Sequence, residues 1–204
     1  MKIDLGISLH ERLLDSAHAI IERSGWSNLT MAAVAGAVGV SRQTVYNEFG
    51  TKHGLAEQLA LRELQRFLDV VRECLAGHTD LVEGIRAACE RVLLMGEESL
   101  IVRAIAGTSQ RTTSPNPTPD NDFLKILTTE SGEIVEASVE IVQQCIAEFY
   151  PQTALTDAEL AVAVESTVRL VLSAMTRPSK PPAQAADDLA WIVSLVLEGA
   201  AARR

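Results

Sequence analysis

The chain has 204 residues, of which 47% are hydrophobic and only 4% aromatic, a composition that suits one or two domains of helices packed through aliphatic side chains. The formal net charge of −9 at pH 7 argues against a protein that coats nucleic acid without selectivity, because such proteins carry a large excess of Lys and Arg. The acidic excess lies mostly behind the amino-terminal part: residues 1–60 hold five Lys or Arg and six Asp or Glu, for a net charge of −1, whereas residues 61–204 hold 13 and 21, for −8.

The first predicted helix begins near residue 9. Its apolar side chains recur at helical spacing, and Ser24 and Gly25 mark its end. Trp26 and Leu29 follow closely enough to cover the same core. The apolar residues of this helix are Leu9, Leu13, Leu14, Ala17, Ile20 and Ile21.

Residues 30–49 predict two short helices separated by a tight turn. Thr30 is placed to accept a hydrogen bond from the unpaired backbone N–H groups at the start of the first of them. Gly39 stands where this helix must end, because only glycine takes a positive φ without a Cβ clash. Ser41 can then cap the second helix, so only a short turn separates the two.

The second of these helices has one apolar and one polar side. Val45 and Phe49 are four residues apart and are expected to face inward onto the preceding helix. No Asp or Glu occurs from Ser24 to Asn47, so the segment lacks the carboxylates that would repel phosphate. This pattern favours a helix that enters the major groove of DNA. Its outward side chains are Arg42, Gln43, Thr44, Tyr46 and Asn47.

This amino-terminal quarter of the chain resembles the TetR family of bacterial transcriptional regulators. The residues that match the family pattern are Thr30, Val34, Ala35, Gly39, Val40, Ser41, Thr44, Val45, Tyr46, Phe49, Thr51, Lys52 and Leu55. Five positions depart from this pattern. Ala33 stands where the family commonly has an acidic residue, Val38 where it has Ala, and Gln43 where it has Gly. Glu48 replaces a common aromatic residue, and Gly50 a common Pro. None of these departures removes a hydrogen-bond donor or the packing core, although Gln43 is expected to alter which bases are read.

The polar groups of this segment suggest particular DNA contacts. Arg42 and Gln43 suit the edges of guanine and adenine, and Thr44 suits a thymine methyl group or a phosphate. The resemblance implies backbone contacts for Tyr46 and Asn47. The candidate DNA-binding residues are Thr30, Ser41, Arg42, Gln43, Thr44, Tyr46, Asn47 and Lys52, the last with Thr51 as the cap of its helix.

Blander interpretations of the same residues stay open. The polar side of the helix could simply be solvated, and Lys52 could be an ordinary surface lysine. Tyr46 and Phe49 could both belong to the core. These alternatives make no use of DNA.

Helical periodicity continues through the middle of the chain. A fourth helix is expected from Thr51 to about Gly77 and His78, with Thr79 as a possible cap for the next one. Residues 99–108 form another short apolar segment. Three prolines between residues 109 and 121 cannot continue a helix and indicate an exposed loop.

The remaining third of the chain predicts further helices. A short one is expected over residues 123–129 and a longer one over residues 132–150. Thr156 and Glu159 form a capping-box pattern for a helix that runs to about Thr176. A proline-rich connector precedes a last helix over residues 185–202, whose inward positions are expected to be Leu189, Ile192, Val193, Val196 and Leu197.

Reading by a single helix covers only a few base pairs, so useful specificity requires two symmetry-related copies on a palindromic operator of double-stranded DNA. The resemblance implies a homodimer in which the last two long helices pair with those of the partner. Surplus apolar positions suit this role, although each could equally fill the core of its own chain. They are Val162, Leu172, Trp191 and Leu195.

The resemblance also implies a small ligand bound among the helices of the second domain, coupled to the DNA-binding part through the fourth helix. A cavity lined by the candidate residues would favour an apolar effector, and the rival interpretation is that they form an ordinary helical core. The candidates are Cys89, Leu93, Ile101, Ile105, Phe123, Leu127, Ile141, Cys145 and Met175.

Other classes of function have weaker support. Cys74, Cys89 and Cys145 lack the spacing of a metal site or a redox pair and suit packing in a reduced, cytoplasmic protein. The four histidines lack metal-site spacing and suit solvated or capping roles. No catalytic motif, phosphate-binding loop or apolar membrane run occurs in the sequence, so we expect neither an enzyme nor a cofactor.

Together these features predict an all-α fold. Residues 1–54 would form a three-helix, helix-turn-helix DNA-binding domain, and residues 55–204 a helical domain for effector binding and dimerisation. The function this implies is sequence-specific regulation of transcription, with repression as the commoner mode in the family. The alternative is a DNA-binding or partner-binding helical protein that responds to no ligand.

Overall fold

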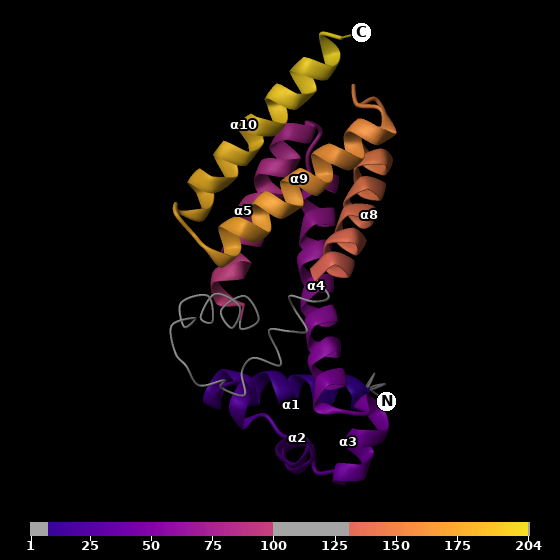
Figure 1. The fold of residues 1–204 in the computed structure, drawn as a ribbon, viewed down its shortest axis with the longest axis vertical. Coiled ribbons are helices and arrows are strands. Elements are labelled where there is room, and N and C mark those ends of the chain that lie inside the picture. The colour runs from indigo at the N-terminus through magenta and orange to yellow at the C-terminus, as the bar shows by residue number, and fades with distance from the viewer. Residues whose placement is uncertain (1–7, 100–130, 204) are drawn as a thin grey trace, which may run out of the picture. The chain divides into compact units, whose positions relative to one another are not determined.

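The structure, a computed structural model, describes residues 8–99 and 131–203. All regular elements in these two ranges are helices, as predicted (Figure 1). They fall into two compact units that divide between Arg62 and Glu63, within one continuous helix. In chain order the elements are α1 Leu9–Ser24, η1 Trp26–Asn28, α2 Met31–Val38, α3 Arg42–Phe49, α4 Lys52–Ala76, α5 Leu81–Glu98, α8 Ser131–Phe149, α9 Asp157–Thr176 and α10 Pro182–Ala201.

The first unit contains α1, η1, α2, α3 and the beginning of α4. Its helix bounds agree with the predicted ones, and Trp26 and Leu29 are buried in its core as expected. Fully buried aliphatic side chains come from each α-helix of the unit and from the segment after η1, so α2 and α3 are held on an apolar base. These side chains are Leu13, Leu14, Leu29, Val34, Val45 and Leu55.

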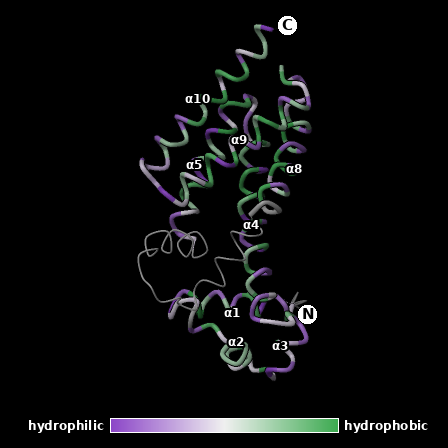
Figure 2. The backbone as a smooth tube through the Cα atoms, in the orientation of Figure 1, coloured by the Kyte–Doolittle hydropathy of each residue, from purple (hydrophilic) through white to green (hydrophobic). Residues whose placement is uncertain are grey.

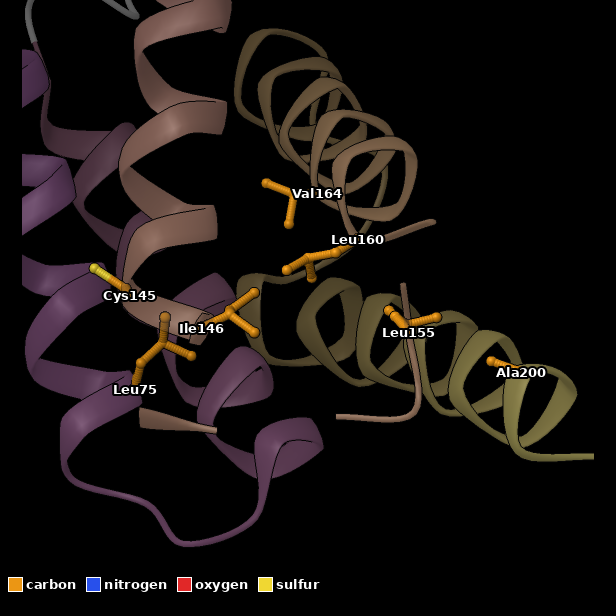
Figure 3. Packing of buried hydrophobic residues seen from close by; sticks show 7 residues of the cluster. All are labelled: Leu75, Cys145, Ile146, Leu155, Leu160, Val164 and Ala200. Carbon is orange, nitrogen blue, oxygen red and sulfur yellow. The ribbon is translucent and has the colours of Figure 1, made fainter. Parts of the chain in front are cut away.

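The second unit contains the rest of α4 with α5, α8, α9 and α10. One cluster joins four of its helices, and Figure 3 shows its side chains gathered between them. Leu75 comes from α4, Cys145 and Ile146 from α8, Leu160 and Val164 from α9, and Ala200 from α10, with Leu155 from the segment before α9. A second cluster joins Cys89 of α5 to Ala186 and Leu189 of α10. These two clusters hold the unit together.

All three cysteines are buried and free, which agrees with the packing role predicted for them. Burial raises the pKa of the Cys89 thiol to about 12, with a smaller contribution from nearby Cys74. Burial also raises the pKa of the Cys145 thiol, partly offset by the Arg72 guanidinium. Both thiols are therefore protonated, apolar parts of the core at neutral pH.

Helix caps are mostly those expected, with two corrections. The capping box of Thr156 and Glu159 is present, but α5 is capped by Asp80, whose carboxylate accepts the Glu83 N–H at 3.0 Å, and not by Thr79. The last helix begins at Pro182 and not at Ala185. Proline is favoured in the first turn because its missing N–H would be unpaired there anyway.

The face of α10 also differs from the prediction. Leu189 is buried and Leu197 partly buried, but Ile192 and Val196 are exposed. Figure 2 shows hydrophobic residues recurring along α9 and α10. More of this hydrophobic surface lies outside the core of the single chain than expected.

The predicted segment 99–108, apart from Ser99, the loop 109–121 and the helix 123–129 lie outside the described residues. Within the described ranges, no helix combines the length and apolar character needed to cross a membrane.

Candidate nucleic-acid interface

The first helix of the candidate interface, α2, is fixed at both ends by local hydrogen bonds. The Thr30 hydroxyl accepts the Ala33 N–H at 3.0 Å, which caps the helix as predicted. At the other end Gly39 adopts a left-handed conformation, with φ of 80° and ψ of 32°. The N–H groups of Gly39 and Val40 both donate to the Ala35 carbonyl, at 2.9 and 3.0 Å. The glycine thus turns the chain sharply toward α3.

The second helix, α3, begins at a serine cap. The Ser41 hydroxyl accepts the Thr44 N–H at 3.1 Å and lies 2.9 Å from the Thr44 hydroxyl. Val45 and Phe49 are buried, so they anchor the helix as predicted. Phe49 is therefore a core residue.

The opposite side of α3 carries exposed polar side chains. Arg42, Gln43 and Asn47 are exposed, and Tyr46 is 46% exposed, so it does not share the core with Phe49. The Gln43 amide donates to the Asn47 amide oxygen at 2.9 Å, one helical turn away. In Figure 2 the chain of α3 is mainly hydrophilic, in contrast to the pale to hydrophobic α2. This side of α3 is available to a ligand.

The junction between α3 and α4 places a cation beside backbone N–H groups. The Thr51 hydroxyl accepts the Gly54 N–H at 3.0 Å and so caps α4. Lys52, the first residue of α4, donates to the Trp26 carbonyl at 3.1 Å, and its ammonium lies 4.7 Å from the centre of the Trp26 ring. The lysine is therefore held in place by the segment after α1.

The same junction requires close approach of two backbones. A Cβ atom built on Gly54 would lie 2.2 Å from the carbonyl oxygen of Phe49. Because that oxygen belongs to the backbone at the end of α3, no side-chain movement can relieve the contact. Gly54 thus allows α4 to start directly against α3.

The eight predicted DNA-binding residues all belong to the first unit. They lie at the start of α2, along α3 and at the start of α4, and all are exposed except Thr44 and Lys52, which are half-buried. Sequence reasoning did not identify His10, whose Nδ1 lies 2.7 Å from the Glu48 carboxylate at the end of α3. The two are separated by 38 residues, and no local pattern relates them.

The predicted effector residues are only partly described. Ile101, Ile105, Phe123 and Leu127 lie outside the described ranges. The others divide between separate places in the second unit: Cys145 and Ile141 belong to the cluster around Leu75, Cys89 packs on α10, Leu93 is buried on α5, and Met175 lies against Gly96.

A pocket of the second unit lies elsewhere. It is lined by the start of α5, the segment between α8 and α9, and the end of α10, and it includes Leu81, Phe149, Pro151 and Leu197. None of the predicted effector residues lines it. The described residues thus place these predicted effector residues in apolar surroundings.

The four predicted dimer residues all lie on the outside of the second unit. Val162 is 66% exposed and Leu172 36% exposed on α9, and Trp191 and Leu195 are 63% and 47% exposed on α10. In the single chain they therefore do not fill a core.

Comparison with known proteins finds similarity over most of the chain. The family model for bacterial regulatory proteins of the tetR family matches residues 13–59, and the model for the C-terminal domain of the bacterial tetracyclin repressor matches residues 80–194. The chain is 28% identical over 191 residues to the HTH-type transcriptional regulator AlkX of Mycobacterium tuberculosis, covering 91% of this chain and 83% of that protein.

Solved structures show the same architecture. The TetR family repressor AlkX from a Dietzia species, implicated in biodegradation of n-alkanes, is 25% identical with a TM-score of 0.74, and the match covers 94% of this chain and 96% of that one. FadR of Thermus thermophilus, a TetR family repressor solved in complex with lauroyl-CoA, is 22% identical with a TM-score of 0.60 over 93% and 94% of the two chains. At that identity the FadR likeness concerns the fold alone.

Proposed function

The chain belongs to the TetR family of bacterial transcriptional regulators, and we propose that it is a repressor that binds a palindromic operator as a homodimer and is released by a small apolar effector. Its helix-turn-helix unit is the DNA-binding domain of that family. The observation that carries the proposal is the exposed polar side of α3, supported on a buried base of Val45 and Phe49.

We assign base reading to the first turn of α3. Arg42 and Gln43 are exposed there, and their side chains can make paired hydrogen bonds to guanine and adenine, respectively. Thr44 would contact a thymine methyl group or a phosphate, and Tyr46 and Asn47 the DNA backbone. These contacts would set both the sequence and the register of binding.

Phosphate binding is assigned to helix starts on either side of α3. The α4 start places backbone N–H groups beside the Lys52 ammonium, and the Thr30 cap of α2 offers a second helix start, with Ser41 at the start of α3. The hydrogen bond from Lys52 to the Trp26 carbonyl orders the ammonium before DNA binds, so less side-chain entropy would be lost on binding a phosphate.

Dimerisation is assigned to α9 and α10. Large apolar side chains exposed on adjoining helices are costly in water, and a second copy of the same surface would cover them. The two DNA-binding domains of the dimer, related by a twofold axis, could then dock on half-sites about one helical turn, or a multiple of it, apart. The anchors we expect at the interface are Val162, Leu172, Trp191 and Leu195.

The effector is proposed to be apolar. The candidate residues that the structure describes are apolar or neutral, including the protonated Cys89 thiol, so a charged ligand would find few partners among them. The AlkX repressor, with which this chain shares 25% identity, is implicated in n-alkane biodegradation. A hydrocarbon or a hydrocarbon-derived ligand is therefore the class to test first.

Release would pass through α4. This helix supplies residues to both compact units, which divide between Arg62 and Glu63. We place the boundary between the DNA-binding domain and the effector domain closer to the start of the helix, after Gly54. A ligand that shifts α4 would change the distance between the two DNA-binding domains of the dimer. The dimer would then no longer fit both half-sites of the operator.

The test is to select bound fragments from the source genome and footprint them. The proposal expects selective protection of a palindrome that is lost on adding an apolar ligand which also raises the thermal midpoint of the protein. Selective binding that no ligand in a panel of apolar and polar metabolites changes would favour the ligand-independent alternative. Stabilisation by polar anions alone would contradict an apolar effector.

A further inference from the structure

The recognition helix α3 carries a single carboxylate, and it occupies an unfavourable position. Glu48 is the only Asp or Glu in α3 and the first after Glu22. It lies in the last turn, where the partial negative charge of the helix end disfavours an anion. A carboxylate on a helix that faces phosphates also weakens DNA binding. A partner that reduces the negative charge of Glu48 would offset both effects.

His10 on α1 is placed to do so. Its Nδ1 lies 2.7 Å from the Oε1 atom of Glu48, and both side chains are about one-third exposed, at 33% and 37%. The same imidazole ring packs against Phe49, with ring centroids 5.1 Å apart and planes tilted by 43°. Since Phe49 is buried, the histidine is fixed by one apolar and one polar contact to consecutive residues of α3.

We propose that His10 is a positioning residue for the recognition helix, which holds the Glu48 carboxylate in place and, when protonated, cancels its charge, so that operator binding strengthens as the pH falls. This inference rests on the proposed function, because it concerns DNA binding by α3.

The sign follows from the two charge states of the pair. A neutral imidazole can still donate from Nδ1, so the hydrogen bond survives at high pH while the net charge of the pair is −1. A protonated imidazole makes the pair neutral and adds a favourable charge near the carbonyl end of α3. Histidine is the residue type whose ordinary charge change falls between about pH 5 and 8, so the measurement covers that range.

Two charged groups of α1 near His10 have partners of their own. On α1, Arg12 donates to the Val38 carbonyl at 3.4 Å, and Glu11 pairs with Arg62 of α4. On α3 the remaining ionisable side chains are Arg42 and Tyr46.

The described part of the first unit holds two other histidines, His18 on α1 and His53 on α4. His53 lies 2.9 Å from Glu57, one turn further along that helix. It is close in sequence to the proposed phosphate-binding start of α4, so its own protonation must be removed from the measurement. The substitution His53→Gln therefore serves as the background for every protein compared.

The experiment measures operator affinity by fluorescence anisotropy from pH 5.5 to 8.0, with full-length protein and the selected operator duplex. Three proteins are compared in the His53→Gln background: otherwise unchanged, Glu48→Gln and His10→Gln. Glutamine at position 10 keeps an amide donor for the carboxylate but cannot become charged. Circular dichroism and thermal melts establish that each variant is folded.

The expected result is a change of roughly threefold to fivefold for the unchanged pair between pH 8 and pH 6, tighter at low pH and smaller at high salt, as for a partly exposed charge. Glu48→Gln should bind at pH 8 about as tightly as the unchanged pair does at pH 6, because each change removes one negative charge from the pair. His10→Gln should stay at the weak, high-pH affinity throughout.

A pH dependence that persists unchanged in His10→Gln, or a Glu48→Gln protein that binds no more tightly at pH 8 than the unchanged pair, overturns the inference while leaving the proposed function intact. A flat profile for the unchanged pair does the same. If the protein prefers no selected duplex over competitor DNA at any pH, the proposed function fails, and the inference fails with it.

Discussion

The two units of this chain differ in how they treat apolar surface. In its described part, the first unit buries most of its aliphatic side chains and presents a short helix with exposed polar groups, so its packing is largely complete within one copy and its polar face suits a charged ligand. The second unit leaves large apolar side chains exposed, most of them on two helices, α9 and α10. The contrast suggests that the first unit is built to meet DNA and the second to meet another apolar surface.

The difference between the two units is tested most directly at Trp191, the large, exposed aromatic side chain of α10. Trp191→Glu should convert a dimer into monomers and weaken operator binding by about 4 kcal/mol, because a symmetric interface loses two copies of an aromatic anchor. Sedimentation and footprinting measure the two effects. Leu94→Glu, at another exposed leucine of the same unit, is the matched control and should leave the dimer intact. A dimer that survives Trp191→Glu would contradict the assignment.

The completeness of the first unit is tested at Gly54. Gly54→Ala should lower the free energy of unfolding by about 3 kcal/mol, since its Cβ would lie 2.2 Å from the Phe49 carbonyl oxygen. Urea denaturation measures the loss. Gly36→Ala in α2 is the control: a Cβ there meets nothing within 4 Å, so the change should be neutral or stabilising by up to about 1 kcal/mol. Equal effects of the two substitutions would contradict the close-approach argument.

The polar surface of the first unit is tested residue by residue. Arg42→Ala and Gln43→Ala should each weaken operator binding by about 1–3 kcal/mol and relax the base preference, if the contacts are bidentate. Lys52→Ala should weaken binding to all sequences alike and lower the salt slope by about one, and its thermal midpoint reports any loss of the Trp26 contact. Equal loss on operator and random DNA for Gln43→Ala would remove it from the reading set.

The dry interior of the second unit is tested by pH. Burial raises the pKa of Cys89 to about 12 in the folded state, above the ordinary 9.0 of the thiol. The stability that this gives is fully present below pH 9.0 and is lost between pH 9.0 and about 12. Between pH 9 and 10, wild type should lose on the order of 1 kcal/mol more than Cys89→Ala in urea unfolding. Equal losses would show that the thiol is not buried.

The parts of the fold that could be predicted from sequence are those held by short-range interactions. The Thr30 and Ser41 caps and the left-handed Gly39 depend on atoms within five residues, and each is found where it was expected. The two errors at helix starts have local causes as well: Asp80 competes with Thr79 for the same cap, and Pro182 fits a first turn.

What could not be predicted depends on contacts between distant residues. His10 meets Glu48, and Lys52 meets Trp26, only because the first unit folds α1 and its following segment against α3 and α4. Periodicity alone could not tell which side of α10 is buried, because that helix has apolar residues on more than one side. For this reason Ile192 and Val196 were predicted to face inward, whereas both are exposed.

The most direct measurement is a footprint of the full-length protein on a genomic fragment that it selects, combined with its mass in solution. The account predicts a dimer that protects two symmetry-related half-sites about one helical turn, or a multiple of it, apart. A monomer, or a protein with no greater affinity for the selected fragment than for competitor DNA, would contradict it.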